Sequence, residues 1–334
     1  DFGQLGDVVM SLPALRAIRD RFPDSQITVL VGKPAHEIIG ASGYANVTIP
    51  VDRVALRDGS KIVSIGRIIK LVMDVRKARY DFVIDLNSFS ETNLLGFLSG
   101  AQHRLFSQRP GRSIDYLANF QPKPPREVKD SHLVDRYLDV IKPLDIQNPS
   151  RAPYLKTLNV ADDAVEALLK KENAHSNALL VGLFPGAGSS ERRWPIERFA
   201  ELADYLIRNQ RVRVIVFGGP EERDLIAQNK HLFPSNTIFF DRLTILQLAS
   251  ALARLSLFVT NDTGPMHIAA AVGTSVIDLL NRPTPNTYTP VGDQHRVICA
   301  TTIKDISVED VYRAAHEMMA SNRVEKIFSR SDER

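Results

Sequence analysis

The feature that most restricts the fold is a regular alternation of short apolar runs with amphipathic helical patterns, which continues through both halves of the chain. Continuous runs of Val, Ile and Leu are typical of strands buried on both faces, and the intervening helices supply the cover. The alternation therefore predicts an α/β fold with parallel sheets. The predicted strands are residues 26–32, 47–52, 81–87, 178–186, 212–219, 237–241, 257–261 and 275–280, and the predicted helices are 34–42, 66–80, 90–100, 132–144, 196–209, 221–229, 244–255, one from 265, and 308–322.

The length of 334 residues exceeds what one hydrophobic core usually organises, so we expect two domains. The alternation stops in residues 101–130, which read as a long loop, and a linker near 150–176 separates two similar halves. We predict two doubly wound Rossmann-like domains that face a central cleft. Residues 1–155 form the first, 156–334 form the second, and the last helix packs back on the first domain.

The start of the chain lacks the strand that a parallel sheet would place there. The first seven residues read as a loop, and the helical spacing of apolar residues begins only after them. A strand normally feeds such a loop, so we expect a short apolar segment upstream of Asp1.

Composition narrows the class of protein. A formal net charge of +3 is too small to indicate a nucleic-acid partner, although it agrees with an anionic substrate or lipid surface. The single cysteine, Cys299, excludes an intramolecular disulfide and favours a reducing compartment. No apolar run reaches the roughly 18 residues of a membrane span, and no signal peptide is visible, so we expect a cytoplasmic protein. No spacing of His, Asp or Glu predicts a metal site.

The stretch after residues 178–186 suits a diphosphate. Gly186 and Gly188 expose backbone N–H groups, Ser189 and Ser190 add hydroxyls, and Arg192 and Arg193 add two guanidinium groups, which bind phosphate oxygens bidentately. The alternative is that the arginines at 192 and 193 form a solvated pair beside a core tryptophan.

Two acids follow the next strand. Glu221 or Glu222 stands where an acid commonly accepts hydrogen bonds from ribose hydroxyls. Either could instead be an ordinary first-turn acid that favours the helix dipole.

A further stretch, residues 261–267, joins a strand to a helix that begins near Pro265. The amides of Thr263, Gly264 and Met266 are predicted to be unpaired and available to phosphate. Asp262 could hold this loop or accept hydrogen bonds from sugar hydroxyls. His267 lies in the first turn, where the helix end favours a neutral imidazole that can donate or accept a hydrogen bond. The alternative is a histidine that only packs against its neighbours.

Asp7 is the candidate general base. It follows Gly3 and Gly6 at the presumed carboxyl edge of the first sheet, where such sheets bind ligands. Capping of the helix is the competing role. The pattern G-x-x-G is not the dinucleotide fingerprint, so no nicotinamide cofactor is predicted.

Together these motifs resemble glycosyltransferase family 9, the ADP-heptose:lipopolysaccharide heptosyltransferases. The matching stretches are LGDVVMSLPALRAIRDRFPDSQI, YDFVIDLNSF, FPGAGSSERRWPIERFAELA and TNDTGPMHIAAAVGTSVIDLL, in that order. The resemblance implies a GT-B fold and an inverting, metal-independent transfer of heptose from an ADP-sugar to the inner core of lipopolysaccharide. No cofactor is implied, because the ADP-sugar is a substrate.

The resemblance also implies roles for matched residues. Asp7 matches the proposed catalytic base, and Glu221 or Glu222 matches the acid near the ribose. Arg192 stands where family members often have Lys, and residues 262–267 match the D-T-G-x-x-H motif around the donor diphosphate and sugar.

The acceptor implied by the resemblance is a glycolipid, so we expect peripheral contact with the inner face of the cytoplasmic membrane. Arg53, Arg57 and Lys61 are candidates to meet acceptor phosphates, the alternative being a solvated basic face.

Two departures from the family pattern leave the donor open. Residues 279–285 replace an aromatic-Gly-Pro-Thr turn, and the loop at 297–307 lacks most of the family's cysteines. The alternatives are a GT-B transferase or epimerase that uses another nucleotide sugar, and a non-catalytic protein that binds sugar nucleotides.

Overall fold

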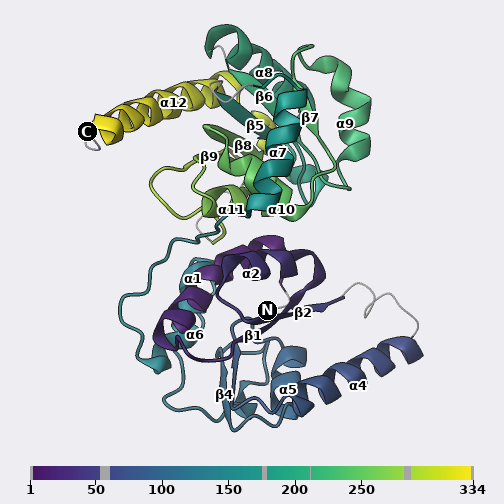
Figure 1. Ribbon diagram of the computed structural model, residues 1–334, viewed down its shortest axis with the longest axis vertical. Helices are drawn as coiled ribbons and strands as arrows, with labels where there is room; N and C mark the ends of the chain where they lie inside the picture. Colours follow the sequence, from purple (N-terminus) through teal and green to yellow (C-terminus); the bar gives the residue numbers. More distant parts are fainter. Residues whose placement is uncertain (1–2, 53–60, 175–178, 211, 282–286, 332–334) are drawn as a thin grey trace. The chain divides into compact units, whose positions relative to one another are not determined.

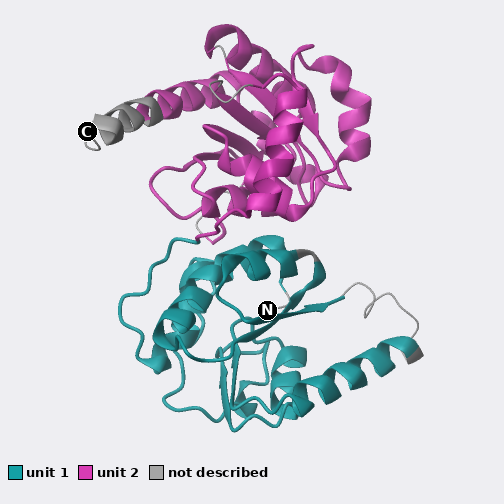
Figure 2. Ribbon diagram, in the orientation of Figure 1, with its two compact units in different colours: residues 1–153 teal, residues 154–334 magenta. Residues whose placement is uncertain are grey.

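The computed structural model describes residues 3–52, 61–174, 179–210, 212–281 and 287–331. The chain divides into two compact units, residues 1–153 and 154–334 (Figure 2). The predicted domain boundary after residue 155 lies close to this division. The functions predicted for the two halves stay predictions.

Unit 1 contains two short parallel sheets with helices packed around them (Figure 1). β1 pairs with β2, and β3 pairs with β4. The elements in order are α1 (Leu5–Arg21), β1 (Thr28–Gly32), α2 (His36–Ser42), β2 (Val47–Val51), α4 (Lys61–Lys77), β3 (Phe82–Asp85), α5 (Ser90–Leu98), β4 (His103–Phe106) and α6 (Leu133–Ile141).

Two expectations for unit 1 are wrong in detail. The region 101–130 is not all loop, because it contains β4, in which only Leu105 and Phe106 are buried apolar residues. Two such residues are too few to produce a recognisable strand pattern. Helix α1 begins at Leu5 rather than after Asp7, because the Asp7 carboxylate accepts the Gln4 N–H at 3.0 Å and so caps a helix that starts earlier.

Unit 2 is built on one sheet of six parallel strands in the order β10-β9-β8-β5-β6-β7. The chain runs outward from β5 to β7 and then returns to the other side of β5, so the strand order reverses between β5 and β8. Ligands of doubly wound folds bind outside the carboxyl ends of the strands at such a switch point. The strands are β5 (Leu180–Phe184), β6 (Arg213–Phe217), β7 (Ile238–Phe240), β8 (Leu257–Asn261), β9 (Val276–Leu280) and β10 (Arg296–Cys299).

Helices cover both faces of this sheet. Alternate side chains of the strands, such as Leu183 and Val259, share one core with α8 (Ile196–Gln210) and α12 (Val308–Ser331). The other helices are α7 (Asn159–Lys171), which packs on α10 (Ile245–Ala253), together with α9 (Arg223–Asn229) and α11 (Gly264–Ala271). Strand β10 was not predicted, because it is a short, largely exposed edge strand.

The described side chains of α12 pack within unit 2, where Val311 and Ala315 are fully buried. The predicted packing of this helix on the first domain stays a prediction. None of the helices in the described ranges is both long enough and apolar enough to cross a membrane.

Candidate functional site

Asn261, the last residue of β8, holds the loop that follows β5. Its Nδ2 donates to the carbonyl oxygens of Pro185 and Gly186 at 3.1 and 3.0 Å, and its Oδ1 accepts the Trp194 N–H at 3.0 Å. Asn261 is fully buried. Asn261 was not among the predicted site residues, although an amide side chain at the end of an apolar strand is a usable signal, since buried polar groups must find partners.

The segment between this loop and α8 is also fixed. The buried Trp194 donates its Nε1–H to the Ile306 carbonyl at 3.0 Å and packs edge-on against Phe199. Arg193 donates through Nε and Nη2 to the Ala187 carbonyl at 3.2 and 3.1 Å. Arg193 was predicted with Arg192 as a diphosphate ligand, but its guanidinium bonds to the loop itself, so only Arg192 is kept as the candidate ligand.

Arg192 and Asp262 lie together at the switch point. Nη1 of Arg192 is 3.5 Å from Oδ2 of Asp262, and the two side chains are 41% and 14% exposed. An ion pair this long and this exposed contributes less than about 1 kcal/mol, so Arg192 can turn toward a phosphate at little cost. Ser189 and Ser190 are exposed on the same loop.

Glu222 reaches the loop after β5 from the end of β6. Its Oε2 accepts the Gly219 N–H at 2.9 Å, and the side chain is buried. A Cβ on Gly186 would lie only 2.4 Å from the Glu222 Oε1, so the absence of a side chain at Gly186 is what admits the carboxylate. Glu221 is exposed, and of the two acids Glu222 is therefore the one that contacts this loop.

The start of α11 differs from the prediction at one amide. The Met266 N–H donates to the Thr263 carbonyl at 3.2 Å, so the prediction that it is unpaired is wrong. The cause is a tight first turn, which satisfies this N–H locally. The amides of Thr263 and Gly264 make no hydrogen bond to the described residues, and they remain the candidate phosphate donors. His267 is buried, as a packed histidine would be, and its role stays a prediction.

A buried carboxyl that the sequence analysis missed lies beside these groups. Asp278 of β9 is in register with Thr260 of β8, is fully buried, and neither of its oxygens has a hydrogen-bond partner among the described residues. Burial raises the pKa of Asp278 well above its usual value, and the nearby Asp262 carboxylate raises it further. The neutral form of Asp278 is therefore favoured.

In unit 1, Asp7 lies in the first turn of α1 and is partly buried. The bond from the Gln4 N–H to its Oδ2 is the capping role that competed with catalysis. A carboxylate has about four lone-pair sites, so this one bond does not exclude a second function.

A buried polar network follows β3. Asp85 accepts the Ser88 N–H at 2.8 Å and the Asn93 Nδ2–H at 2.9 Å, and Ser88 has a left-handed backbone with φ 47°. Burial raises the pKa of Asp85, although these hydrogen bonds oppose the shift. The 101–130 region is tied to the same network, because Arg109 donates to the Asn87 carbonyl and the Ile114 N–H donates to Asn93 Oδ1. Arg109 also pairs with the partly buried Glu127.

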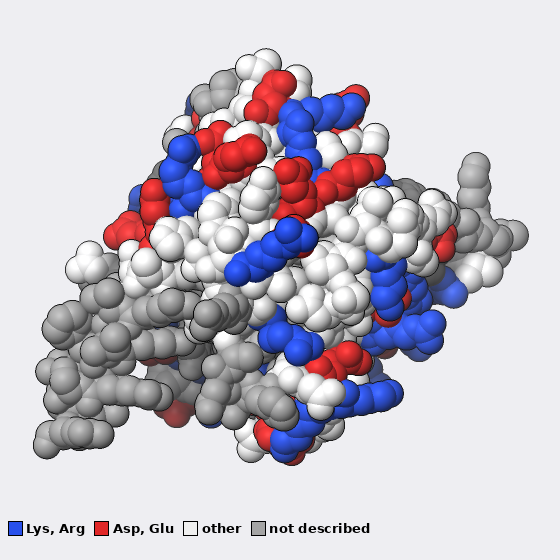
Figure 3. Space-filling view, turned by 90° about the horizontal axis from the view of Figure 1, so that it is seen from above, with Lys and Arg blue, Asp and Glu red and all other residues white. Residues whose placement is uncertain are grey.

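The predicted acceptor residues are not placed by the structure. Arg53 and Arg57 lie outside the described residues, and Lys61 begins α4 but its side chain is not described. On the face seen in Figure 3, acidic and basic side chains are interspersed.

Comparison with known proteins agrees with the motifs. The model of glycosyltransferase family 9 (heptosyltransferase) matches residues 68–316. Lipopolysaccharide heptosyltransferase 2 of Escherichia coli K12 is 26% identical over 309 residues, which cover 88% of this chain and 85% of that protein.

Solved structures confirm the predicted GT-B fold. A glycosyltransferase family 9 protein from Veillonella parvula DSM 2008 superposes with a TM-score of 0.85 at 22% identity, covering 96% of both chains. Escherichia coli heptosyltransferase WaaC, solved with ADP-2-deoxy-2-fluoro heptose, superposes with a TM-score of 0.73 at 19% identity, covering 95% of this chain and 97% of that one.

Proposed function

This chain belongs to glycosyltransferase family 9, and from that premise we propose that it transfers heptose from ADP-heptose to the inner core of lipopolysaccharide. One observation carries the proposal. The contacts at the switch point form a continuous series. Glu222 lies against Gly186, and the Gly186 carbonyl accepts a hydrogen bond from Asn261. The loop that these contacts hold leads to Arg192, which pairs with Asp262. Such a series suits a ligand with a ribose at one end and a diphosphate at the other.

In this proposal Glu222 accepts hydrogen bonds from the ribose. The Arg192 guanidinium, the hydroxyls of Ser189 and Ser190, and the amides of Thr263 and Gly264 bind the diphosphate. Asp262 and His267 face the donor sugar, where Asp262 accepts hydrogen bonds from hydroxyl groups. Arg192 and the amides stabilise the charge that develops on the diphosphate as it leaves.

Asp7 is proposed to act as the general base. It removes the proton from the acceptor hydroxyl while that oxygen forms a bond to the anomeric carbon. The bond from the anomeric carbon to the phosphate oxygen breaks at the same time, and ADP leaves with the electron pair. Attack opposite the leaving group inverts the anomeric configuration.

The donor is tested by thermal shift with ADP-, UDP-, GDP- and CDP-sugars. A ligand that binds only the folded protein raises Tm with its concentration, so the expected result is stabilisation by ADP-heptose above the others. A larger shift with another nucleotide would instead favour the alternative that this is a GT-B enzyme with a different donor. Transfer of heptose from ADP-heptose to an extracted heptose-deficient core tests the reaction itself, and binding without transfer would refute catalysis.

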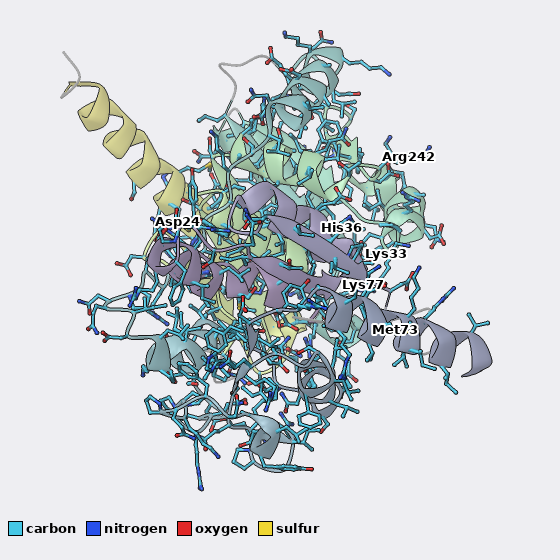
Figure 4. The ribbon with its side chains drawn as sticks, turned by 60° about the horizontal axis from the view of Figure 1, so that its bottom comes forward. Asp24, Lys33, His36, Met73, Lys77 and Arg242 are labelled. Carbon is cyan, nitrogen blue, oxygen red and sulfur yellow. The ribbon has the colours of Figure 1, made fainter. Side chains whose placement is uncertain are left out.

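The glycolipid acceptor requires approach to a membrane surface, and α4 offers a suitable face. Ile65, Ile69 and Met73 of this helix are all more than half exposed, and Lys70 and Lys77 lie on the same helix; Figure 4 labels Met73 and Lys77. Apolar residues flanked by lysines are typical of helices that lie in the interface of anionic bilayers. We therefore propose that α4 contacts the inner membrane surface.

Flotation with vesicles tests this contact. We expect binding to vesicles that contain anionic lipid, reduced binding to zwitterionic vesicles, and loss of binding in the Ile69→Ser, Met73→Ser double variant. The matched control is Val160→Ser, which removes an apolar side chain that is 83% exposed on α7. Equal binding by all three proteins would refute a role for α4.

A further inference from the structure

A buried row of polar side chains leads from β9 to the start of α11. Asp278 of β9 and Thr260 of β8 are register partners, and both residues are fully buried. The Thr260 Oγ1 is 3.3 Å from the Thr263 Oγ1, and Thr263 is the N-cap residue of α11. The row therefore ends beside the amides that are proposed to bind the diphosphate.

Asp278 and Thr260 share one face of the sheet. Val259 and Leu279, which are their neighbours along the two strands, belong to the core shared with α8 and α12. Because side chains alternate between the faces of a strand, Asp278 and Thr260 point to the opposite face. Helix α11 contacts both strands, and none of its described residues belongs to that core (Figure 1). The two polar side chains therefore lie beneath α11.

The Asp278 carboxyl lacks the partner that its burial requires. Neither of its oxygens makes a hydrogen bond with the described residues. Burial raises the pKa of Asp278 well above its usual value, so the neutral acid, which has one O–H to donate, is favoured. A buried donor without an acceptor is costly, and Thr260 is the polar residue that the strand register places beside it.

The Thr263 hydroxyl is held by Thr260 rather than by its own helix. An N-cap threonine normally accepts a hydrogen bond from an amide of the first turn, but Thr263 makes no such bond. The Thr260 hydroxyl donates to the Asn261 carbonyl at 2.9 Å. A hydroxyl has a single hydrogen, so Thr260 cannot also donate to Thr263. In this arrangement Thr263 donates to Thr260.

A bound diphosphate requires the opposite direction. Its oxygens accept hydrogen bonds, so the Thr263 hydroxyl must turn its hydrogen toward them. Thr263 can then accept from Thr260, and Thr260 can accept from the acid O–H of Asp278. Reversal thus satisfies every hydroxyl in the row and also the buried acid, which begins the row as a donor.

We infer that Asp278 is a positioning residue for the donor: its O–H donates to Thr260, Thr260 donates to Thr263, and Thr263 donates to a diphosphate oxygen. This inference rests on the proposed function, because the diphosphate of that site is the last acceptor. Asp278 does not touch the ligand. Hydrogen bonds in a chain polarise and strengthen one another, so the phosphate contact made by Thr263 depends on the buried acid.

Calorimetric titration with ADP tests the row. Asp278→Leu removes the donor at similar volume, whereas Asp278→Asn keeps one in its amide N–H. We expect the Leu variant to bind ADP roughly 3- to 10-fold more weakly, the scale of one neutral hydrogen bond, and the Asn variant to bind it almost normally. The Leu variant should also have a higher Tm, because it replaces a buried polar group by an apolar one. Weaker binding by a more stable protein is not the result of a damaged fold.

Thr260→Val interrupts the row without changing Asp278, and it serves as the second test if Asp278→Leu folds poorly. We expect the same loss of ADP affinity, and no further loss when the two substitutions are combined, because both break one chain. The matched control is Thr237→Val, which removes a buried hydroxyl that has no partner among the described residues and precedes β7. Its Kd for ADP should equal that of the unchanged chain.

The outcomes separate this inference from the proposed function. Normal ADP affinity in Asp278→Leu and Thr260→Val, an equal loss in Asp278→Asn, or additive losses in the double variant would each overturn the inference. If Arg192→Ala weakens ADP binding and Asp278→Leu does not, the diphosphate site stands and the row alone fails. No ADP binding by the unchanged chain would overturn both.

Discussion

Substitution of Gly186 by Ala tests the proposed ribose site with little other disturbance. The new Cβ would lie 2.4 Å from the Glu222 Oε1 and 2.5 Å from its Cγ, which is closer than real Cβ contacts allow. The Gly186 backbone is not in the left-handed region, so Ala is not strained there. The Glu222 side chain must move instead, because it is the flexible partner.

The size of the effect follows from the bonds that Glu222 makes. Displacement breaks its hydrogen bond from the Gly219 N–H, at a cost of about 1 kcal/mol in unfolding free energy. It also removes the proposed bond to the ribose. A hydrogen bond to a charged group is worth about 1.5–3 kcal/mol, which corresponds to a roughly 10- to 150-fold weaker Kd for ADP.

Calorimetric titration with ADP measures this change, and Gly188→Ala is the matched control. A Cβ at Gly188 meets no atom within 4 Å, although it lies on the same loop. We expect weakened binding in the Gly186 variant and near-normal binding in the control. Normal ADP affinity in Gly186→Ala, or an equal loss in both variants, would refute the placement of the ribose at Glu222.

Three other predictions concern catalysis and pH. Asp7→Asn should lower kcat by about 100-fold or more while the Kd for ADP is unchanged, and near-normal turnover would remove Asp7 as the base. Asp278 has a raised pKa in the folded state, so its contribution to stability is present below the unfolded pKa and is lost as pH rises. Asp278→Asn should therefore stabilise the protein by an amount that grows from about pH 4 to pH 7 in chemical unfolding. A difference in unfolding free energy between the two proteins that stays constant over this range would contradict the prediction. Burial lowers the pKa of His295 to about 4, so the unfolded state binds the extra proton and stability falls as pH drops from about 6.5 to 4, by up to roughly 3 kcal/mol. His295→Gln should remove this pH dependence, and an unchanged pH profile would assign the loss to other groups.

The sequence predicted most of the fold because strands buried on both faces leave continuous apolar runs. The runs containing β5, β6 and β8 are of this kind, and all three are buried nearly throughout. Strands β4 and β10 were missed because each is short and partly exposed, so half of its residues follow no apolar pattern. The edge strand β7 was predicted, because two of its three residues are buried and apolar. Pattern analysis thus fails where a short strand has few buried apolar residues.

The candidate site was predictable where a residue type implies its chemistry, as for Arg192 and the acids after β6. It was not predictable where the role depends on distance. Asn261 acts through three bonds to residues more than 60 positions away in the sequence. The choice between Glu221 and Glu222 likewise depends on which side chain meets Gly186, and this contact is visible only in the folded chain.

The pairing of Arg192 with Asp262 explains how an acid can lie in a site proposed to bind a diphosphate. Without a ligand, the carboxylate compensates the guanidinium at 3.5 Å. A diphosphate would add negative charge beside Asp262, and an ionised Asp278 would add another. Burial favours the neutral form of Asp278, and so the proposed site presents one carboxylate rather than two to the donor. The protonated carboxyl of Asp278 therefore adds no negative charge beside the proposed diphosphate site, whereas its ionised form would oppose anion binding there.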